Sequence, residues 1–435
     1  MAVLLAMVLV AVGCSSDPGD EGAADYLQRA DQCEPNMGAA LDAWGDQGYS
    51  GAIAVLGDDR HCAIGIGLAD QATGRPVTAG TTFSIGSITK AVTAAAVLDL
   101  VDQGRIALDD TAGQHVDGLT GAVNDLTIRN LLVHTSGLTG YHGRDHVALS
   151  KSEAIDAISQ LDISFEQGTD YSYTNAGYTL LALIVEAVSD QGYRQYLVDE
   201  ILRDGSDLPI GGFWDGEPAG AEPRAVGYLA GGVPGELGDF AGPHWALDGN
   251  GGVAMTVLEM AVWTRALFSG KILSEEATEQ LTTIRKRVAG GEYELPGWVE
   301  LPPQIIGERL ILASGGGGSI GHLMDVAWLP DTGRVIAVAQ NATSRNVNDL
   351  LLNIADALVT GTGVPTPAPI AEVDPAVVAD MVGSYRLDDG TAGPDRRPAS
   401  TIEVAIDDVD PRGLLVTAGG PAAITALFPV PAGFE

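Results

Sequence analysis

Residues 81–104 read TTFSIGSITKAVTAAAVLDLVDQG, and they decide the fold because they join a turn to a long, alanine-rich helix. Alanine and leucine are good helix formers and glycine ends helices, so we expect this helix to begin near Ser87 and to stop at Gly104. Lys90 follows Ser87 by three residues. Residues at this spacing share one helix face, so the hydroxyl and the amine can meet.

Ser87 and Lys90 are residue types that nucleophilic catalysis requires. A serine hydroxyl is a weak nucleophile and needs an adjacent base, and a buried lysine amine can act as that base. The helix N-terminus also favours negative charge that develops beside Ser87. A Ser-x-x-Lys pattern arises often by chance, however, so this motif needs support from the rest of the chain.

A second motif, Tyr173-Thr174-Asn175, stands at the start of the apolar segment AGYTLLALIVEAVS. A tyrosine beside a Ser/Lys pair can share the transferred proton and return it to the leaving group. Asn175 could donate to a substrate carbonyl and accept a hydrogen bond from Lys90. The alternative interpretation is a turn that precedes a buried helix.

The remaining patterns predict strands near both ends of the central region and helices between them. The expected helices cover residues 35–47, 126–134, 178–192 and 257–270, and the expected strands cover 51–57, 62–70 and the two halves of 324–341. The last pair is joined by the turn sequence Pro-Asp-Thr-Gly. This order predicts a mixed sheet beside a helical region.

Four segments together resemble successive landmarks of the serine β-lactamase-related family, which includes class C β-lactamases, D-alanyl-D-alanine carboxypeptidases and related esterases. The segments are SIGSITKAVTAAAVLDLVDQGRIALDD, LTIRNLLVHTSGL, YSYTNAGYTLLALIVE and NGGVAMTVLEMAVWTRAL, and the likeness extends over roughly residues 45 to 345. The resemblance implies an α/β (α+β) fold of the β-lactamase/transpeptidase type, with a mixed antiparallel sheet flanked by helices.

The same resemblance implies a mechanism through an acyl-enzyme, with Ser87 as nucleophile and Lys90 as general base. Tyr173 and Asn175 take the places of the second-motif tyrosine and asparagine. The expected substrate is a small-molecule ester or amide, or a peptide. We expect no cofactor and no metal.

The third family landmark departs from its usual form. Relatives carry Lys-Thr-Gly or His-x-Gly on a strand that lines the site, whereas this chain has the segment ASGGGGSIGH at residues 313–322. The usual cation falls on Gly315 or Ser314, and neither is charged. An N–H group of Gly317 or Gly318 could pair with that of Ser87 as an oxyanion hole, with Ser314 among the substrate-binding residues.

Other basic residues offer alternatives for the missing cation. Arg309 and His322 are the two candidates near the third landmark. We expect His134 to cap or pack at a helix end, and His142 and His146 to be loop residues rather than zinc ligands.

The formal net charge of -35 and the pI of about 4.2 exclude whole classes of partner. Such a surface repels nucleic-acid phosphates and anionic lipid head groups. We therefore expect no nucleic-acid partner, and membrane contact through a lipid anchor only.

The first 14 residues predict a signal peptide with a lipobox. The run AVLLAMVLVAVG is too short to span a bilayer and ends at Cys14. Lipidation of Cys14, followed by a flexible polar tether over residues 15–34, would hold an exported protein at the outer face of the cytoplasmic membrane. A plain secretory signal, which would leave the protein periplasmic or extracellular, is the alternative. In an oxidising compartment Cys33 and Cys62 could form a disulfide or remain two buried thiols.

The chain is expected to divide into a hydrolase domain at 35–362, a Pro-rich linker at 363–375 and a small β domain at 376–435. The last segment alternates short apolar runs with Gly, Asp and Pro, as antiparallel strands do. It resembles the lipocalin-like tail found in this family, either whole or as an incomplete barrel.

Three functions compete at this point. The first is a serine hydrolase acting on ester or amide bonds, and the second is a D-alanyl-D-alanine carboxypeptidase or β-lactamase. The third is a catalytically silent relative that binds peptidoglycan or a partner protein, an alternative motivated by the absent third-motif cation. The presence of Ser87, Lys90, Tyr173 and Asn175 together favours an enzyme.

Overall fold

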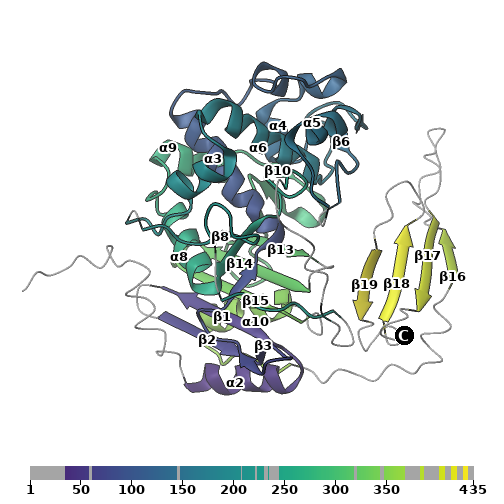
Figure 1. The fold of residues 1–435 in the computed structure, drawn as a ribbon. Helices are drawn as coiled ribbons and strands as arrows, with labels where there is room; N and C mark the ends of the chain where they lie inside the picture. The colour runs from purple at the N-terminus through teal and green to yellow at the C-terminus, as the bar shows by residue number, and fades with distance from the viewer. Residues whose placement is uncertain are drawn as a thin grey trace, which may run out of the picture.

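A computed structural model describes most of the central part of the chain (Figure 1). The described residues are 35–57, 61–144, 147–206, 208–220, 223–229, 234, 244–317, 321–342, 347–367, 383–386, 401–406, 413–418 and 425–429. The predicted signal peptide, the tether, Cys14, Cys33, His146 and Gly318 lie outside these residues. No helix among the described residues has both the length and the hydropathy needed to cross a bilayer.

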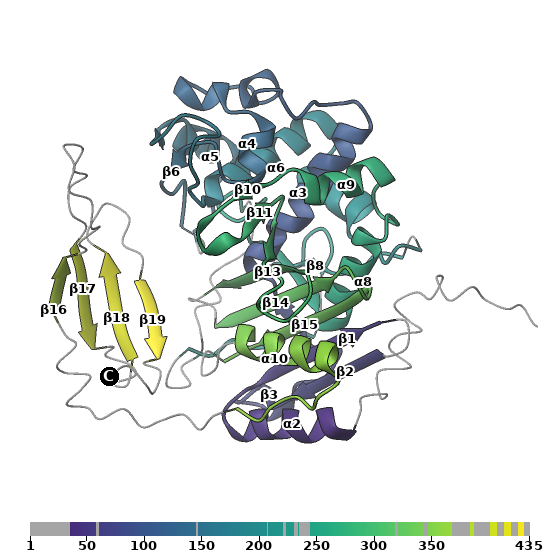
Figure 2. The ribbon, with the colours of Figure 1, turned by 180° about the vertical axis from the view of Figure 1, so that it is seen from behind.

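An eight-stranded antiparallel sheet forms the centre of the main domain (Figures 1 and 2). Its strand order is β10 (Lys286–Arg287), β11 (Tyr293–Leu295), β12 (Trp298–Leu301), β13 (Leu310–Gly317), β14 (His322–Leu329), β15 (Arg334–Gln340), β1 (Gly51–Leu56) and β2 (His61–Ile66). The N-terminal hairpin therefore joins the sheet beside its last strand in sequence, with Gly51 opposite Gln340. The predicted hairpin and the predicted pair of strands at 324–341 are confirmed.

The two faces of this sheet pack against different helices. One face is covered by α2 (Pro35–Asp46) and α10 (Val347–Thr360), and Figure 2 shows α10 in front of the strands. The other face packs against α3 (Thr89–Asp102) and α8 (Val257–Phe268) through a second, larger apolar cluster. The sheet is thus buried on both sides, which explains its continuous runs of Ala, Val, Ile and Leu.

Helix α3 is the central element of the larger core. Eleven of its 14 residues are buried, and the short helix η1 (Gly86–Ile88) precedes it. The helix stops two residues before Gly104, whose φ of 67° suits glycine and few other residues. The predicted helix in 81–104 is confirmed, and burial all round explains why it carries no polar face.

Helices α4 (Ile128–Leu132) and α6 (Asn175–Ser189) confirm two further predictions. They belong to a helical region that lies above the sheet in Figure 1, together with α5 (Lys151–Ser159) and α9 (Glu275–Thr283). The sequence analysis did not predict α5, α9 or α10. The first two are short surface helices that begin at the serine caps Ser150 and Ser274.

Short elements connect these parts. They are β3 (Leu68–Asp70), β4 (Arg75–Pro76), β5 (Thr82–Ser84), η2 (Ala112–Gln114), η3 (Gly121–Asp125), β6 (Leu138–Thr139), β7 (Asp162–Ile163), α7 (Tyr193–Tyr196), η4 (Leu197–Ile201), β8 (Gly212–Phe213), β9 (Val253–Thr256) and η6 (Ala289–Gly291). Strand β5, which leads into the Ser87 turn, pairs with β9, which leads into α8. This pairing ties the start of α3 to the segment before α8.

The described strands of the C-terminal segment form a four-stranded antiparallel sheet. Its order is β16 (Gly383–Arg386), β17 (Thr401–Ile406), β18 (Gly413–Ala418) and β19 (Thr425–Pro429). These described strands agree with the expected antiparallel strands, and the extent of the small β domain at 376–435 stays a prediction. Strands β16 and β19 are not paired with each other, so the four described strands form an open sheet. The lipocalin-like character of this segment stays a prediction.

Two further predictions concern the ends of the main domain. The first residues of the predicted linker belong to that domain, because Val364 is buried and the carbonyl of Pro365 accepts a hydrogen bond from Trp44. Cys62, on β2, is disulfide-bonded. Its predicted partner, Cys33, is not among the described residues, so the pairing itself stays a prediction.

Candidate active site

Ser87 and Lys90 meet as their spacing predicts. Ser87 lies in η1 and Lys90 is the second residue of α3, and the Lys90 Nζ atom donates a hydrogen bond to Ser87 Oγ at 3.0 Å. The lysine is 2% exposed, whereas the serine is half-buried. The partly exposed Ser87 hydroxyl is therefore hydrogen-bonded to a buried amine.

Tyr173 approaches the same serine oxygen from another element. Its Oη atom donates to Ser87 Oγ at 2.8 Å, and the Lys90 Nζ atom lies 4.8 Å from the centre of the tyrosine ring. The tyrosine side chain is 50% exposed, so it also faces solvent. Two groups able to accept and return a proton thus converge on one hydroxyl.

Asn175 does not make the contact with Lys90 that was expected. It is the first residue of α6, and its buried Oδ1 atom has no hydrogen-bond partner among the described residues. The expectation that this oxygen accepts from Lys90 is therefore wrong in this structure. Lys90 Nζ donates instead to the main-chain carbonyl of Asn250 at 3.1 Å.

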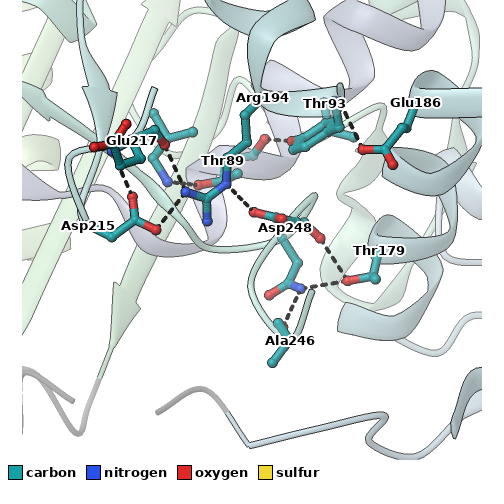
Figure 3. A network of polar contacts seen from close by, with 12 residues as sticks. Thr89, Thr93, Thr179, Glu186, Arg194, Asp215, Glu217, Ala246 and Asp248 are labelled. Atoms are coloured by element: carbon teal, nitrogen blue, oxygen red, sulfur yellow. Dashed lines mark hydrogen bonds and ion pairs between the residues drawn. The ribbon is translucent and has the colours of Figure 1, made fainter. Parts of the chain in front are cut away.

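The carbonyl of Asn250 is held by a network that the sequence analysis missed (Figure 3). The Asn250 side chain donates to Thr179 Oγ1 and to the Ala246 carbonyl, both at 2.9 Å. Thr179 in turn donates to the carbonyl of Asp248 at 2.9 Å. The turn that supplies the acceptor for Lys90 is thus tied to α6.

A half-buried arginine anchors the same turn. Figure 3 shows Arg194 between two carboxylates, with Nε 2.8 Å from Asp248 Oδ1 and Nη1 2.6 Å from Asp215 Oδ2. Burial raises the pKa of Asp248 to about 6, against the opposing effect of Arg194. An ion pair with a buried carboxylate adds little net stability, but this one holds Asp248, which lies two positions before Asn250.

Strand β13 passes directly behind the Ser87 turn. A Cβ atom at Gly315 would lie 2.0 Å from the carbonyl oxygen of Ile85 and 2.8 Å from the backbone nitrogen of Ser87. No side chain fits at this position, so one of the two places expected for a cation can hold none. A Cβ atom at Gly86 would lie 2.6 Å from the nitrogen of Gly316. The backbone beside the nucleophile is therefore that of Gly315 and Gly316.

The expected oxyanion hole stays a prediction. Gly317 is the last residue of β13, opposite His322, and Gly318 lies outside the described residues. The close approach of β13 to the Ser87 turn brings the glycine segment beside the nucleophile.

Ser314 points to the other side of β13 from Gly315, because side chains alternate along a strand. Its hydroxyl is hydrogen-bonded to Asp325, the residue opposite it on β14, and that carboxyl also bonds Asn348 on α10. Burial raises the pKa of Asp325 to about 6. Ser314 thus contacts an acid, and its predicted role in substrate binding stays a prediction.

Neither alternative cation fits the site. His322 is completely buried against Phe83 and Trp214, and burial lowers its pKa to about 3, so it is neutral near pH 7. Arg309 directly precedes β13, and its Nε is 3.4 Å from Glu300 Oε1. The hypothesis that His322 supplies the charge is wrong, and Arg309 already faces a carboxylate.

His134 packs against Tyr173, in agreement with the prediction that it packs at a helix end. It is 1% exposed, its ring centre lies 4.5 Å from that of Tyr173, and burial lowers its pKa to about 3. His142 lies in a loop, as predicted, where it is buried and its Nε2 lies 3.0 Å from the carbonyl of Trp245.

Comparison with known proteins agrees with this geometry. The β-lactamase family model matches residues 32–361. The penicillin-binding protein 4* of Bacillus subtilis (strain 168) is 25% identical over 370 residues, covering 78% of this chain and 80% of that protein. The putative penicillin-binding protein PbpX of the same organism is 29% identical over 240 residues, covering 54% of this chain and 59% of PbpX.

Solved structures show the same fold. An octameric penicillin-binding protein homologue from Pyrococcus abyssi aligns with a TM-score of 0.64 at 24% identity, covering 92% of this chain and 91% of that one. A D-amino acid amidase from Ochrobactrum anthropi SV3 aligns with a TM-score of 0.61 at 19% identity, covering 74% and 96%.

Proposed function

Because the chain belongs to the β-lactamase family, we propose that it is a serine hydrolase that acts on ester or amide bonds through an acyl-enzyme on Ser87. The observation that supports this most is the convergence of Lys90 Nζ and Tyr173 Oη on Ser87 Oγ, at 3.0 and 2.8 Å. A protein that only binds peptides would have no need of this arrangement.

In the proposed reaction Ser87 Oγ attacks the substrate carbonyl carbon while its proton passes to Lys90 or Tyr173. The oxyanion that forms accepts hydrogen bonds from the backbone N–H groups of Ser87 and of Gly317 or Gly318. The same pair of side chains returns the proton to the leaving group, whose bond to carbon breaks. Water then attacks the acyl-enzyme by the reverse sequence and releases the acid.

The proposed substrates lack a carboxylate beside the scissile bond. Gly315 cannot carry a cation, Ser314 contacts Asp325, and His322 is neutral. The net charge of -35 also lowers the local concentration of anionic substrates. We therefore favour neutral or cationic esters and amides over β-lactams and D-alanyl-D-alanine peptides.

The test of this function is covalent labelling of the purified protein. A fluorophosphonate probe should modify Ser87, the label should be located by peptide mass spectrometry, and the Ser87→Ala variant should remain unlabelled but folded. A fluorescent penicillin should label more slowly. Failure of both probes on the wild-type protein would favour the silent, peptide-binding alternative.

We also propose that the protein is exported and lipidated at Cys14, on the evidence of the sequence alone. The mass of the mature protein from a bacterial host gives the test. A diacylglyceryl-modified N-terminal cysteine is expected, and an unmodified Cys14 or an intact N-terminus would contradict the proposal.

A further inference from the structure

A buried carboxylic acid stands behind the catalytic residues, and the mechanism above does not use it. Glu294 belongs to β11, and its side chain is 8% exposed. Tyr171 Oη donates a hydrogen bond to Glu294 Oε2 at 3.1 Å, and His134 Nε2 lies 3.8 Å from Glu294 Oε1. Glu294 lies 123 positions from Tyr171 in the sequence, and no motif marked it as a site residue.

His134 connects this acid to Tyr173. Its Nδ1 atom accepts a hydrogen bond from the backbone N–H of Thr174 at 3.3 Å, so the proton of the neutral ring must reside on Nε2, which faces Glu294. The ring also packs on Tyr173, with 4.5 Å between centres. Protonation of Nδ1 would break the bond to Thr174, the residue that follows the catalytic tyrosine.

The carboxyl group of Glu294 also interacts electrostatically with Lys90. Burial raises its pKa to about 7, while the hydrogen bond from Tyr171 and the charge of Lys90 oppose that rise. The titratable and charged groups around it come from several elements. They are Lys90 of α3, His134 after α4, Tyr171 and Tyr173 before α6, Tyr178 within α6, and Glu292 before β11.

We propose that Glu294 is a positioning residue that sets the charge state of Lys90 and, through His134, holds Tyr173 against Ser87. An ionised Glu294 favours the ammonium form of Lys90, whereas a neutral Glu294 favours the free amine that can accept the serine proton. The inference rests on the proposed function, because it concerns the base of that reaction.

The Glu294→Gln variant tests the proposal, since glutamine keeps the size of the side chain and an acceptor for Tyr171 but removes the charge. The measurements are kcat/KM for a short-chain nitrophenyl ester and the rate of fluorophosphonate labelling, each between pH 5 and 9. Both rates fall on the acidic side of their pH profiles, and we call this fall the acidic limb. In Glu294→Gln the midpoint of the acidic limb should move to lower pH by about half a unit or more. The Glu294→Asp variant, which keeps the charge, should retain the wild-type limb.

Two further variants make the result specific. Tyr171→Phe removes a donor that favours the ionised carboxylate, so it should shift the limb in the same direction by a smaller amount. Glu300→Gln, on the adjacent strand β12 where the carboxylate faces Arg309, is the matched control and should leave the profile unchanged.

The outcomes separate this inference from the proposed function. A wild-type protein that neither turns over ester nor takes the label contradicts both. If the wild type is active but the acidic limb has the same midpoint in Glu294→Gln and Tyr171→Phe as in the wild type, only the role of Glu294 is contradicted. If Glu294→Gln does not fold, the Tyr171→Phe profile decides the matter by the same criterion.

Discussion

The phenol oxygen of Tyr173 lies 2.8 Å from the hydroxyl oxygen of Ser87, although 86 positions separate the two residues in sequence. Lys90 reaches the same oxygen from within α3 at 3.0 Å. The Ser87 hydroxyl thus contacts two groups that can accept its proton, and we expect substitutions of these two groups to have non-additive effects on activity.

Lys90→Ala and Tyr173→Phe should each reduce kcat/KM by about 10²–10⁴-fold, the usual contribution of proton transfer. The double variant should lose little more than either single variant, because the two side chains serve one proton-transfer step. Steady-state kinetics on a nitrophenyl ester provide the measurement. Losses that multiply in the double variant would show that the residues act independently.

Substrate preference should reflect the absence of a cation at the third landmark. A charge-assisted hydrogen bond to a substrate carboxylate is worth about 1.5–3 kcal/mol, or about one to two decades in kcat/KM. We expect a short-chain nitrophenyl ester to exceed a chromogenic cephalosporin in kcat/KM. A cephalosporin favoured tenfold or more would mean that another group supplies the charge.

Gly315→Ala should damage both fold and activity. The new Cβ atom would meet the Ile85 carbonyl oxygen at 2.0 Å, and such overpacking costs about 1–3 kcal/mol of the free energy of unfolding. Displacement of the Ser87 turn by about 1 Å can also cost about 10²-fold in rate. Denaturant unfolding and ester hydrolysis give the two measurements.

Gly38→Ala is the matched control for that substitution. Gly38 lies in α2 with no atom within 4 Å of its added Cβ, so alanine should raise stability slightly by its helix propensity. Equal stability changes in the two variants would contradict the close packing of β13 on the Ser87 turn.

His134 should make the protein sensitive to acid. Its pKa in the folded state is about 3, below the ordinary 6.5, because burial and Lys90 disfavour the charged ring. Its contribution to stability is therefore complete above pH 6.5 and is lost as the pH falls toward 3, since the unfolded chain binds the proton more readily. The wild type should lose stability across this range.

The His134→Asn variant isolates that effect. Asparagine tolerates the φ of 54° found at this position and does not titrate. Its melting temperature should start lower at pH 7, because packing on Tyr173 is lost, but it should fall less between pH 6.5 and 4 than that of the wild type. Parallel curves for the two proteins would contradict a neutral, buried His134.

Much of the fold was accessible from sequence because local patterns carry it. The alanine-rich stretch around Lys90 and the apolar segment after Asn175 are long runs of helix-forming residues, and residues 324–341 hold two apolar runs on either side of a Pro-Asp-Thr-Gly turn. The helices α5 and α9 were missed because each has only nine residues, most of them polar.

The sequence by itself determined the family, the main elements and the pair Ser87–Lys90, because residues three apart on a helix meet whatever surrounds them. Only the tertiary structure decided which atoms complete the site. The Asn250 carbonyl, rather than the side chain of Asn175, accepts from Lys90, and Glu294 comes from a distant strand. Strand β13 packs so closely on the Ser87 turn that Gly315 can bear no side chain. Such contacts join segments more than 100 residues apart, and their geometry depends on the packing of the whole sheet against α3, which no local pattern encodes.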